Sequence, residues 1–133
     1  MCLTNCGGRP PEEDRVFWKV VSERTRQGPY FRKVYTPGQT VNACWFPKLA
    51  RKWWGLDKER DTYDGGVIHV YTTEITALSA AHHMNNFTFR DPDEVYTSPL
   101  VPFTVIEVKC RPEHWIAWGY LDEAAYTQVE VLT

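Results

Sequence analysis

The stretch from residue 65 to 83 contains the side chains best placed to do chemistry. His69 lies in a β-rich apolar run, between Val67 and Tyr71 on one face of the expected strand. A histidine there can act as a base, donate a hydrogen bond to a ligand, or be a satisfied core residue. We favour the core role for His69 and keep it as a candidate ligand-binding residue.

A second cluster interleaves cations with aromatic rings, an arrangement that can stack bases and contact phosphates. The net charge of −2 and the acidic residues just downstream oppose binding to nucleic acid. We therefore favour a short helix that is half-buried through its tryptophans. The candidate residues for contact with a partner, here and later in the chain, are Trp53, Trp54, Arg51, Lys52, Trp115 and Trp118.

The cysteines do not indicate a metal site. Cys2 and Cys6 form one CxxxC pair, whereas a zinc site usually offers two close pairs. Cys44 and Cys110 are isolated within apolar stretches, where a thiol behaves as a small buried hydrophobe.

The composition is that of a single globular domain. The chain has 133 residues, of which 43% are hydrophobic and 24% charged, and its aromatic content of 14% is high. No apolar run approaches the ~20 residues needed to span a membrane. The start of the chain has no apolar segment of a secretory signal, so we expect a cytoplasmic protein.

The pattern of apolar residues predicts an α+β domain with a mostly antiparallel, twisted sheet of about six strands. One main helix is expected at about 73–84, capped by Thr72 or Thr73, with one or two short helices besides. The short helices are expected at 48–54 and, as a single turn, at 122–125. The clearest expected strands lie at 16–21, 30–35, 67–71, 103–110 and 128–132, with the first two forming a hairpin.

The first residues differ in composition from the rest of the chain. Residues 1–14 are rich in glycine, proline and charge, which is typical of a flexible arm. We expect residues 15–133 to form the single compact domain.

The central strand and helix resemble the core of the ADP-ribosyltransferase-like superfamily. The run from Gly66 to Thr73, followed by Ala77 or Ala80, matches that family's glycine, aromatic-containing β-run, hydroxyl residue and alanine-bearing helix. A late Q-x-E triplet at 128–130 matches the arginine-type branch of the family. The central stretch also resembles small phage-encoded proteins of unknown function.

The resemblance to ADP-ribosyltransferases implies roles for four residues toward NAD. Glu130 would hold the nicotinamide-ribose hydroxyl and stabilise oxocarbenium charge, and Gln128 would orient the acceptor. Tyr71 would stack on nicotinamide, and Thr72 would support the glutamate.

The chain departs from that family on its first strand. The family places an arginine or histidine there to hold NAD, and here the strand offers only Lys19. Arg32, on the next expected strand, is the other cation that would lie near the pyrophosphate. A lysine cannot reproduce the forked hydrogen bonding of arginine to a phosphate.

Three functions remain open from the sequence. We favour a small, non-catalytic accessory or inhibitory binding protein, phage- or mobile-element-encoded, that engages a protein or nucleotide partner. The aromatic excess and the incomplete catalytic set favour it. The alternatives are an ADP-ribosyltransferase-like enzyme that uses NAD and a weak nucleic-acid binder. No metal, no membrane and, outside the NAD alternative, no cofactor is expected.

Overall fold

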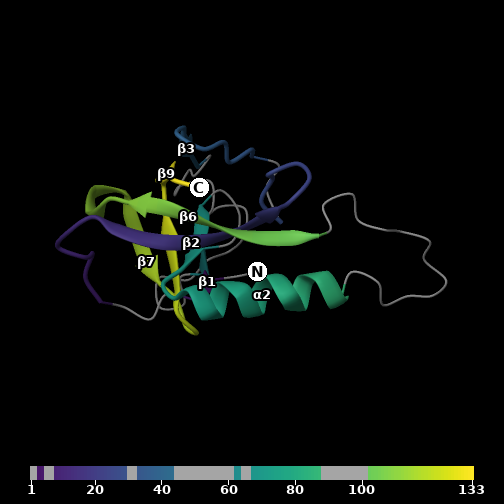
Figure 1. Cartoon of the computed structure of the whole chain (residues 1–133). Helices are drawn as coiled ribbons and strands as arrows, with labels where there is room; N and C mark the ends of the chain where they lie inside the picture. Colours follow the sequence, from purple (N-terminus) through teal and green to yellow (C-terminus); the bar gives the residue numbers. More distant parts are fainter. Residues whose placement is uncertain (1–2, 5–7, 30–32, 44–61, 64–66, 88–101) are drawn as a thin grey trace.

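The computed structural model describes residues 3–4, 8–29, 33–43, 62–63, 67–87 and 102–133. These residues form a seven-stranded antiparallel sheet, a separate two-stranded ladder, one α-helix and a 3-10 turn, which confirms the predicted α+β class (Figure 1). The elements are β1 (Leu3–Thr4), β2 (Arg15–Ser22), β3 (Thr40–Asn42), β4 (Thr62–Tyr63), β5 (Ile68–Tyr71), α2 (Glu74–Phe87), β6 (Phe103–Cys110), the 3-10 turn (Pro112–His114), β7 (Trp115–Trp118), β8 (Glu123–Tyr126) and β9 (Gln128–Val131).

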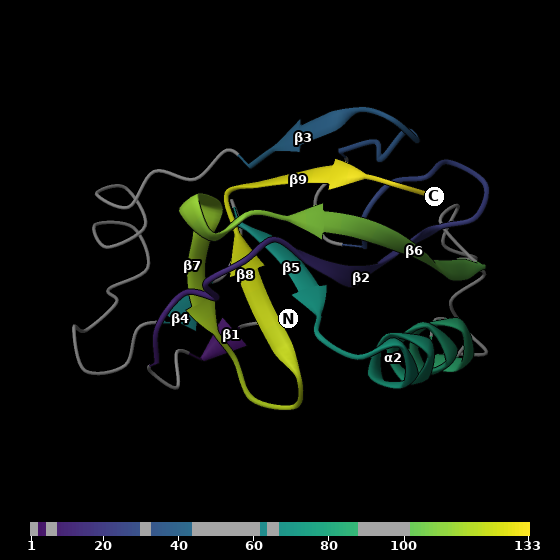
Figure 2. The same ribbon diagram turned by 60° about the vertical axis from the view of Figure 1, so that its left-hand side comes forward.

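The strand order in the large sheet is β3-β9-β6-β2-β5-β8-β7. Its longest ladder joins β2 to β6 in continuous register, from Arg15 opposite Cys110 to Ser22 opposite Phe103. The sheet twists strongly, so that β7 and β8 run steeply across the direction of β6 and β9 (Figure 2). The small ladder pairs β1 with β4.

Alternate residues of the strands supply two large apolar clusters, one on each face of the sheet, and the described residues form a third, small cluster at Val67, Ala117 and Ala125. The larger cluster is built from β-branched and aromatic residues, among them Val70, Val108 and Tyr126, which are fully buried. On the other face, α2 covers β2, β5 and β6 through the small residues Ala77 and Ala81. Small side chains on the inner face of a helix let its backbone approach the sheet closely.

The helix begins where the sequence predicts. The side-chain oxygen of Thr73 accepts a hydrogen bond from the amide of Thr76 at 3.4 Å, so Thr73 is the capping residue. The helix ends at Phe87, three residues beyond the predicted end at 84. Asn85, just beyond the predicted end, turns its side chain to the sheet and forms hydrogen bonds with the backbone of Phe103.

Two local predictions are wrong. A helical turn was expected at 122–125, but residues 123–126 form strand β8, in which Ala124 and Ala125 are fully buried between β5 and β7. The hairpin expected between β2 and residues 30–35 does not form in the part of that segment that is described, residues 33–35: β2 pairs with β5 and β6, and Val34 makes an isolated bridge to Gln27. The short helix expected at 48–54 lies outside the described residues.

The N-terminal segment contacts the main sheet at Trp118 of β7 and at Lys109 of β6, which pairs with Asp14 at 3.5 Å. The indole nitrogen of Trp118 donates a hydrogen bond to the carbonyl oxygen of Arg9 at 2.7 Å. The flexibility expected for residues 1–14 stays a prediction. Within the described part of the chain, no helix has both the length and the apolar character that a membrane crossing requires.

Candidate functional site

A pocket of about 450 Å³ lies between the N-terminal segment and the hairpin that joins β7 to β8. We call it the Trp118 pocket. The residues that line it are Pro11, Arg15, Phe17, Thr72, Trp118, Gly119, Asp122 and Glu123. Its size falls within the range of small-ligand sites in proteins.

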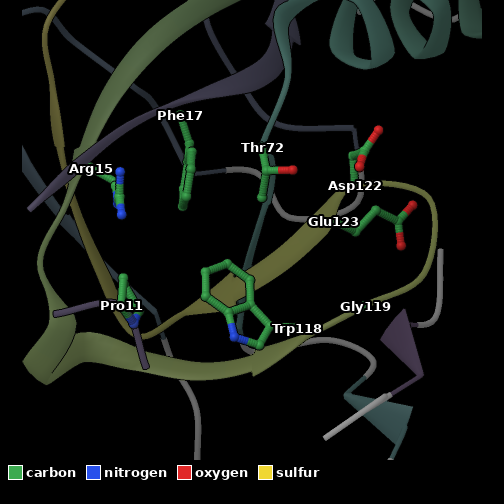
Figure 3. Close-up of a pocket in the computed structure, with 8 residues that line it drawn as sticks. All are labelled: Pro11, Arg15, Phe17, Thr72, Trp118, Gly119, Asp122 and Glu123. Carbon is green, nitrogen blue, oxygen red and sulfur yellow. The ribbon is translucent and has the colours of Figure 1, made fainter. Parts of the chain in front are cut away.

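Aromatic contacts fix the ring of Trp118 in the middle of this pocket (Figure 3). Phe17 meets it edge-on, with the ring centroids 6.2 Å apart, and Trp115 packs against it at 5.8 Å. The hydrogen bond from its indole nitrogen to Arg9 sets the rotation of the ring. Trp118 is therefore a preorganised apolar surface.

The acidic wall of the pocket comes from the turn between β7 and β8. The amide of Gly119 donates to the carbonyl oxygen of Glu123 at 2.8 Å, which closes the turn. Leu121 and Asp122 both adopt positive φ, at 57° and 58°, a conformation that costs free energy for residues other than glycine. Backbone strain of this kind is concentrated at functional sites.

Asp122 is also tied to the start of α2. Its carbonyl oxygen accepts the amide hydrogen of Thr72 at 2.7 Å, and its carboxylate accepts the hydroxyl hydrogen of Thr76 at 3.1 Å. These bonds hold the strained turn against the junction of β5 and α2, and they fix the position of the Asp122 carboxylate.

Charges of opposite sign line the two ends of the pocket. Arg15 stands on one side of Trp118, and Asp122 and Glu123 stand on the other (Figure 3). None of the three forms an ion pair with another described residue. Burial raises the pKa of Glu123 above its usual value, because the charged form has lost part of its hydration. Around an apolar ring, the pocket thus presents three charged groups that have no ion-pair partner within the described part of the chain.

Two of the residues singled out in the sequence meet in this pocket. Thr72, from the ADP-ribosyltransferase resemblance, and Trp118, a candidate partner-contacting residue, both line it. Tyr71 does not, because its side chain is buried under α2 with Val20 and Phe103.

The Q-x-E triplet lies elsewhere in the sheet. Gln128 and Glu130 belong to β9, and the strands β6 and β2 separate β9 from β5. Three strand spacings of about 4.8 Å put these strands roughly 14 Å apart. The carboxylate of Glu130 instead forms an ion pair with Arg111 at 3.8 Å. The fold therefore does not bring Glu130 into one site with Tyr71 and Thr72.

The candidate ligand-binding residues are buried or lie outside the described chain. Lys19 is only 7% exposed, and its ammonium lies 5.5 Å from the centroid of the Tyr35 ring. Burial lowers the pKa of Lys19 from 10.5 to about 8. His69 is buried on β5 opposite Ala125, in the core position that we favoured. Arg32 lies outside the described residues.

The remaining candidates from the sequence are Trp115, the cysteines and the basic-aromatic cluster at 51–54. Trp115 is partly buried and supports Trp118. Cys110 is fully buried, and burial raises the pKa of its thiol to about 12, as expected for an inert core cysteine. Among the described residues, no group of three or more potential metal ligands comes together. Arg51, Lys52, Trp53 and Trp54 lie outside the described residues.

Sequence reasoning missed the charged residues of the Trp118 pocket. By sequence alone, Arg15 is only the first residue of the expected domain, and Asp122 and Glu123 belong to an expected helical turn. The available signal was Gly119 directly after an aromatic run, which indicates a turn that leads into another strand.

Comparison of the chain with protein-family models, with curated proteins and with solved structures found no match. The site must therefore be interpreted from its own geometry.

Proposed function

We propose that this protein is a non-catalytic binding protein that engages a protein partner through the Trp118 pocket. The observation that supports this proposal is the fixed ring of Trp118, flanked by Arg15 on one side and by Asp122 and Glu123 on the other. Tryptophan and arginine are the residues that most often dominate the energy of an interface.

Preorganisation favours binding at this site. The Trp118 ring is held by Phe17 and by the carbonyl of Arg9, and the acidic turn is held by Thr76. A partner would therefore order few side chains when it binds, which lowers the entropic cost of association.

The surroundings of the pocket favour a protein partner. Tyr120 and Leu121, at the tip of the same hairpin, are 63% and 82% exposed. Ile75, which is 77% exposed, precedes Thr76, the residue hydrogen-bonded to the Asp122 carboxylate. Large apolar side chains beside a charged pocket are typical of protein interfaces.

An ADP-ribosyltransferase reaction needs a carboxylate beside the ribose, where positive charge develops. Glu130 does not stand beside Tyr71 and Thr72, since β6 and β2 intervene. This separation disfavours the ADP-ribosyltransferase alternative.

The proposal is tested by nuclear magnetic resonance of the ¹⁵N-labelled protein, titrated with a fragment library that includes NAD. Fragments that bind are expected to shift the Trp118 indole signal and the amides of Gly119 and Glu123. Trp118→Phe should weaken these responses. Trp18→Phe is the control and should leave them unchanged, because the Trp18 ring packs against the two large core clusters and does not line the pocket.

Two results would contradict the proposal. One is a library in which no fragment shifts the signals of the pocket. The other is release of nicotinamide from NAD by the purified protein.

A further inference from the structure

We infer that the Trp118 pocket binds the C-terminal residue of a partner chain, and that this residue is basic. Its cationic group would lie at Asp122 and Glu123, and its carboxylate would lie at Arg15. The inference rests on the proposed binding function and specifies the chemistry of the ligand.

The acidic end of the pocket is suited to bind a cation. Glu123 is half-buried, and its raised pKa reflects hydration that its carboxylate has lost. The adjacent Asp122 adds a second carboxylate, whose position is fixed by Thr76. A guanidinium group has a forked set of donors that matches carboxylate oxygens, so it would restore the interactions that burial removed.

The opposite end of the pocket, at Arg15, is suited to bind an anion. Arg15 lines the pocket from the first residue of β2, opposite Cys110 of β6. Its guanidinium has no carboxylate partner among the described residues, although Asp14 precedes it and pairs instead with Lys109 at 3.5 Å. A single terminal carboxylate suits the two parallel donors of one arginine.

The middle of the pocket suits the apolar stem of a basic side chain. Trp118 lies between the two charged ends (Figure 3). Arginine and lysine pack their methylene groups on apolar surfaces, and a guanidinium also stacks on an indole ring. One residue with a cation, a stem and a carboxylate thus matches all three parts of the lining.

A nucleotide matches the pocket less well, although its base could stack on Trp118. Its phosphates would bring negative charge toward Asp122 and Glu123. The exposed side chains of Glu12 and Glu13, next to Pro11, add further negative charge near this site. Like charges gathered on one face disfavour the approach of an anionic ligand.

The test uses calorimetry and the same NMR signals with three matched probes: N-acetyl-arginine, its C-terminal amide and N-acetyl-citrulline. The amide lacks the carboxylate, and citrulline replaces the guanidinium by a neutral group of the same shape. N-acetyl-arginine is expected to bind at the Trp118 signals about threefold or more tightly than either analogue, which is the range for exposed charge pairs.

Variants assign each charge to one end of the ligand. Arg15→Gln should abolish the preference for N-acetyl-arginine over its amide while retaining the preference over citrulline. Glu123→Gln should abolish the preference for N-acetyl-arginine over N-acetyl-citrulline while retaining the preference over the amide. The control is Arg111→Gln, which removes a guanidinium paired with Glu130 on β9 and should change neither preference. Thermal unfolding shows that each variant is folded.

The outcomes separate this inference from the proposed function. Equal binding of the amide, or of citrulline, overturns the inference. So does binding of adenosine monophosphate at the Trp118 signals with no response to N-acetyl-arginine; that result keeps the pocket as a binding site but replaces the protein partner by a nucleotide. If free arginine binds more tightly than N-acetyl-arginine, the ligand is the free amino acid and not the C-terminal residue of a chain, and the inference is overturned. If no probe and no library fragment binds at the pocket, both proposals fail.

Discussion

The side-chain amide of Asn85 forms two hydrogen bonds with the backbone of Phe103. Its nitrogen donates to the carbonyl oxygen at 3.2 Å, and its oxygen accepts the amide hydrogen at 2.6 Å. The Asn85 side chain thus pairs with the backbone of Phe103 in the way that a residue of a neighbouring strand would. This pairing joins the last turns of α2 to the first residue of β6.

Asn85→Ala is expected to lower the free energy of unfolding by about 1–3 kcal/mol, because it leaves a partly buried backbone donor and acceptor unsatisfied. Urea denaturation measures the change. Asn86→Ala is the matched control: the neighbouring amide is exposed, and its hydrogen bond within the described residues is to the ring of His82 on its own helix, at 2.9 Å. Equal losses in the two variants would show that the bonds to Phe103 do not contribute.

The buried ammonium of Lys19 is expected to make stability depend on pH. The unfolded chain holds this proton up to about pH 10.5, whereas the folded chain releases it near pH 8. The unfolded state therefore binds more protons in this window, and a rise in pH through it stabilises the fold, by about 3 kcal/mol at most.

Comparison with Lys19→Met isolates this effect. Burial also raises the pKa values of Tyr35, Cys110 and Tyr126, which opposes stability at high pH, but these groups are present in both proteins. We expect Lys19→Met to be more stable than the wild type at pH 7 and to lose most of this advantage by pH 10. Denaturant titrations at both pH values measure it; a variant less stable at pH 7 would disprove the prediction.

Gly8 is expected to be required for the contact between the N-terminal segment and Trp118. A Cβ at this position would lie 2.9 Å from Cδ1 of Trp118, and its backbone has a φ of 101°. Gly8→Ala should therefore displace the segment and shift the indole NMR signal of Trp118. Gly38→Ala is the control, since Gly38 has a φ of 82° but open space around it. Gly38→Ala should lower the free energy of unfolding by about 1 kcal/mol through backbone strain, and it should leave the Trp118 indole signal unshifted.

Leu121→Gly is expected to stabilise the protein by up to about 1 kcal/mol. The substitution removes the strain of a positive φ, and it removes little burial because Leu121 is largely exposed. Tyr120→Gly, at the neighbouring position, should destabilise, because the residue has no positive φ to relieve. Thermal unfolding tests both, and a lower melting temperature for Leu121→Gly would refute the prediction.

Much of the fold is predictable from local patterns. The expected strand at 103–110 coincides with β6, and those at 16–21 and 128–132 match β2 and β9 within a residue. The error at β8 has a clear cause. Ala124 and Ala125 favour helix by propensity, but the tertiary fold buries them between two strands.

The site is less predictable, because it depends on the order of the strands. Trp118 and Thr72 were singled out for different reasons, and only the pairing of β8 between β5 and β7 brings them together. The same order separates Glu130 from Tyr71. Hydrophobic periodicity assigns residues to faces of a sheet, but it does not determine which strands become neighbours.

The ladder between β2 and β6 also has a consequence for biosynthesis. β2 pairs with β6 along its whole length, and residues 23–102 lie between the two strands. At about 5–20 residues per second, the ribosome needs several seconds to deliver β6 after β2 has emerged. During that interval the apolar side chains of β2 have no partner in the ladder, and the pairing that follows is strongly non-local, which slows folding. The nascent chain should therefore depend on chaperones more than its small size suggests.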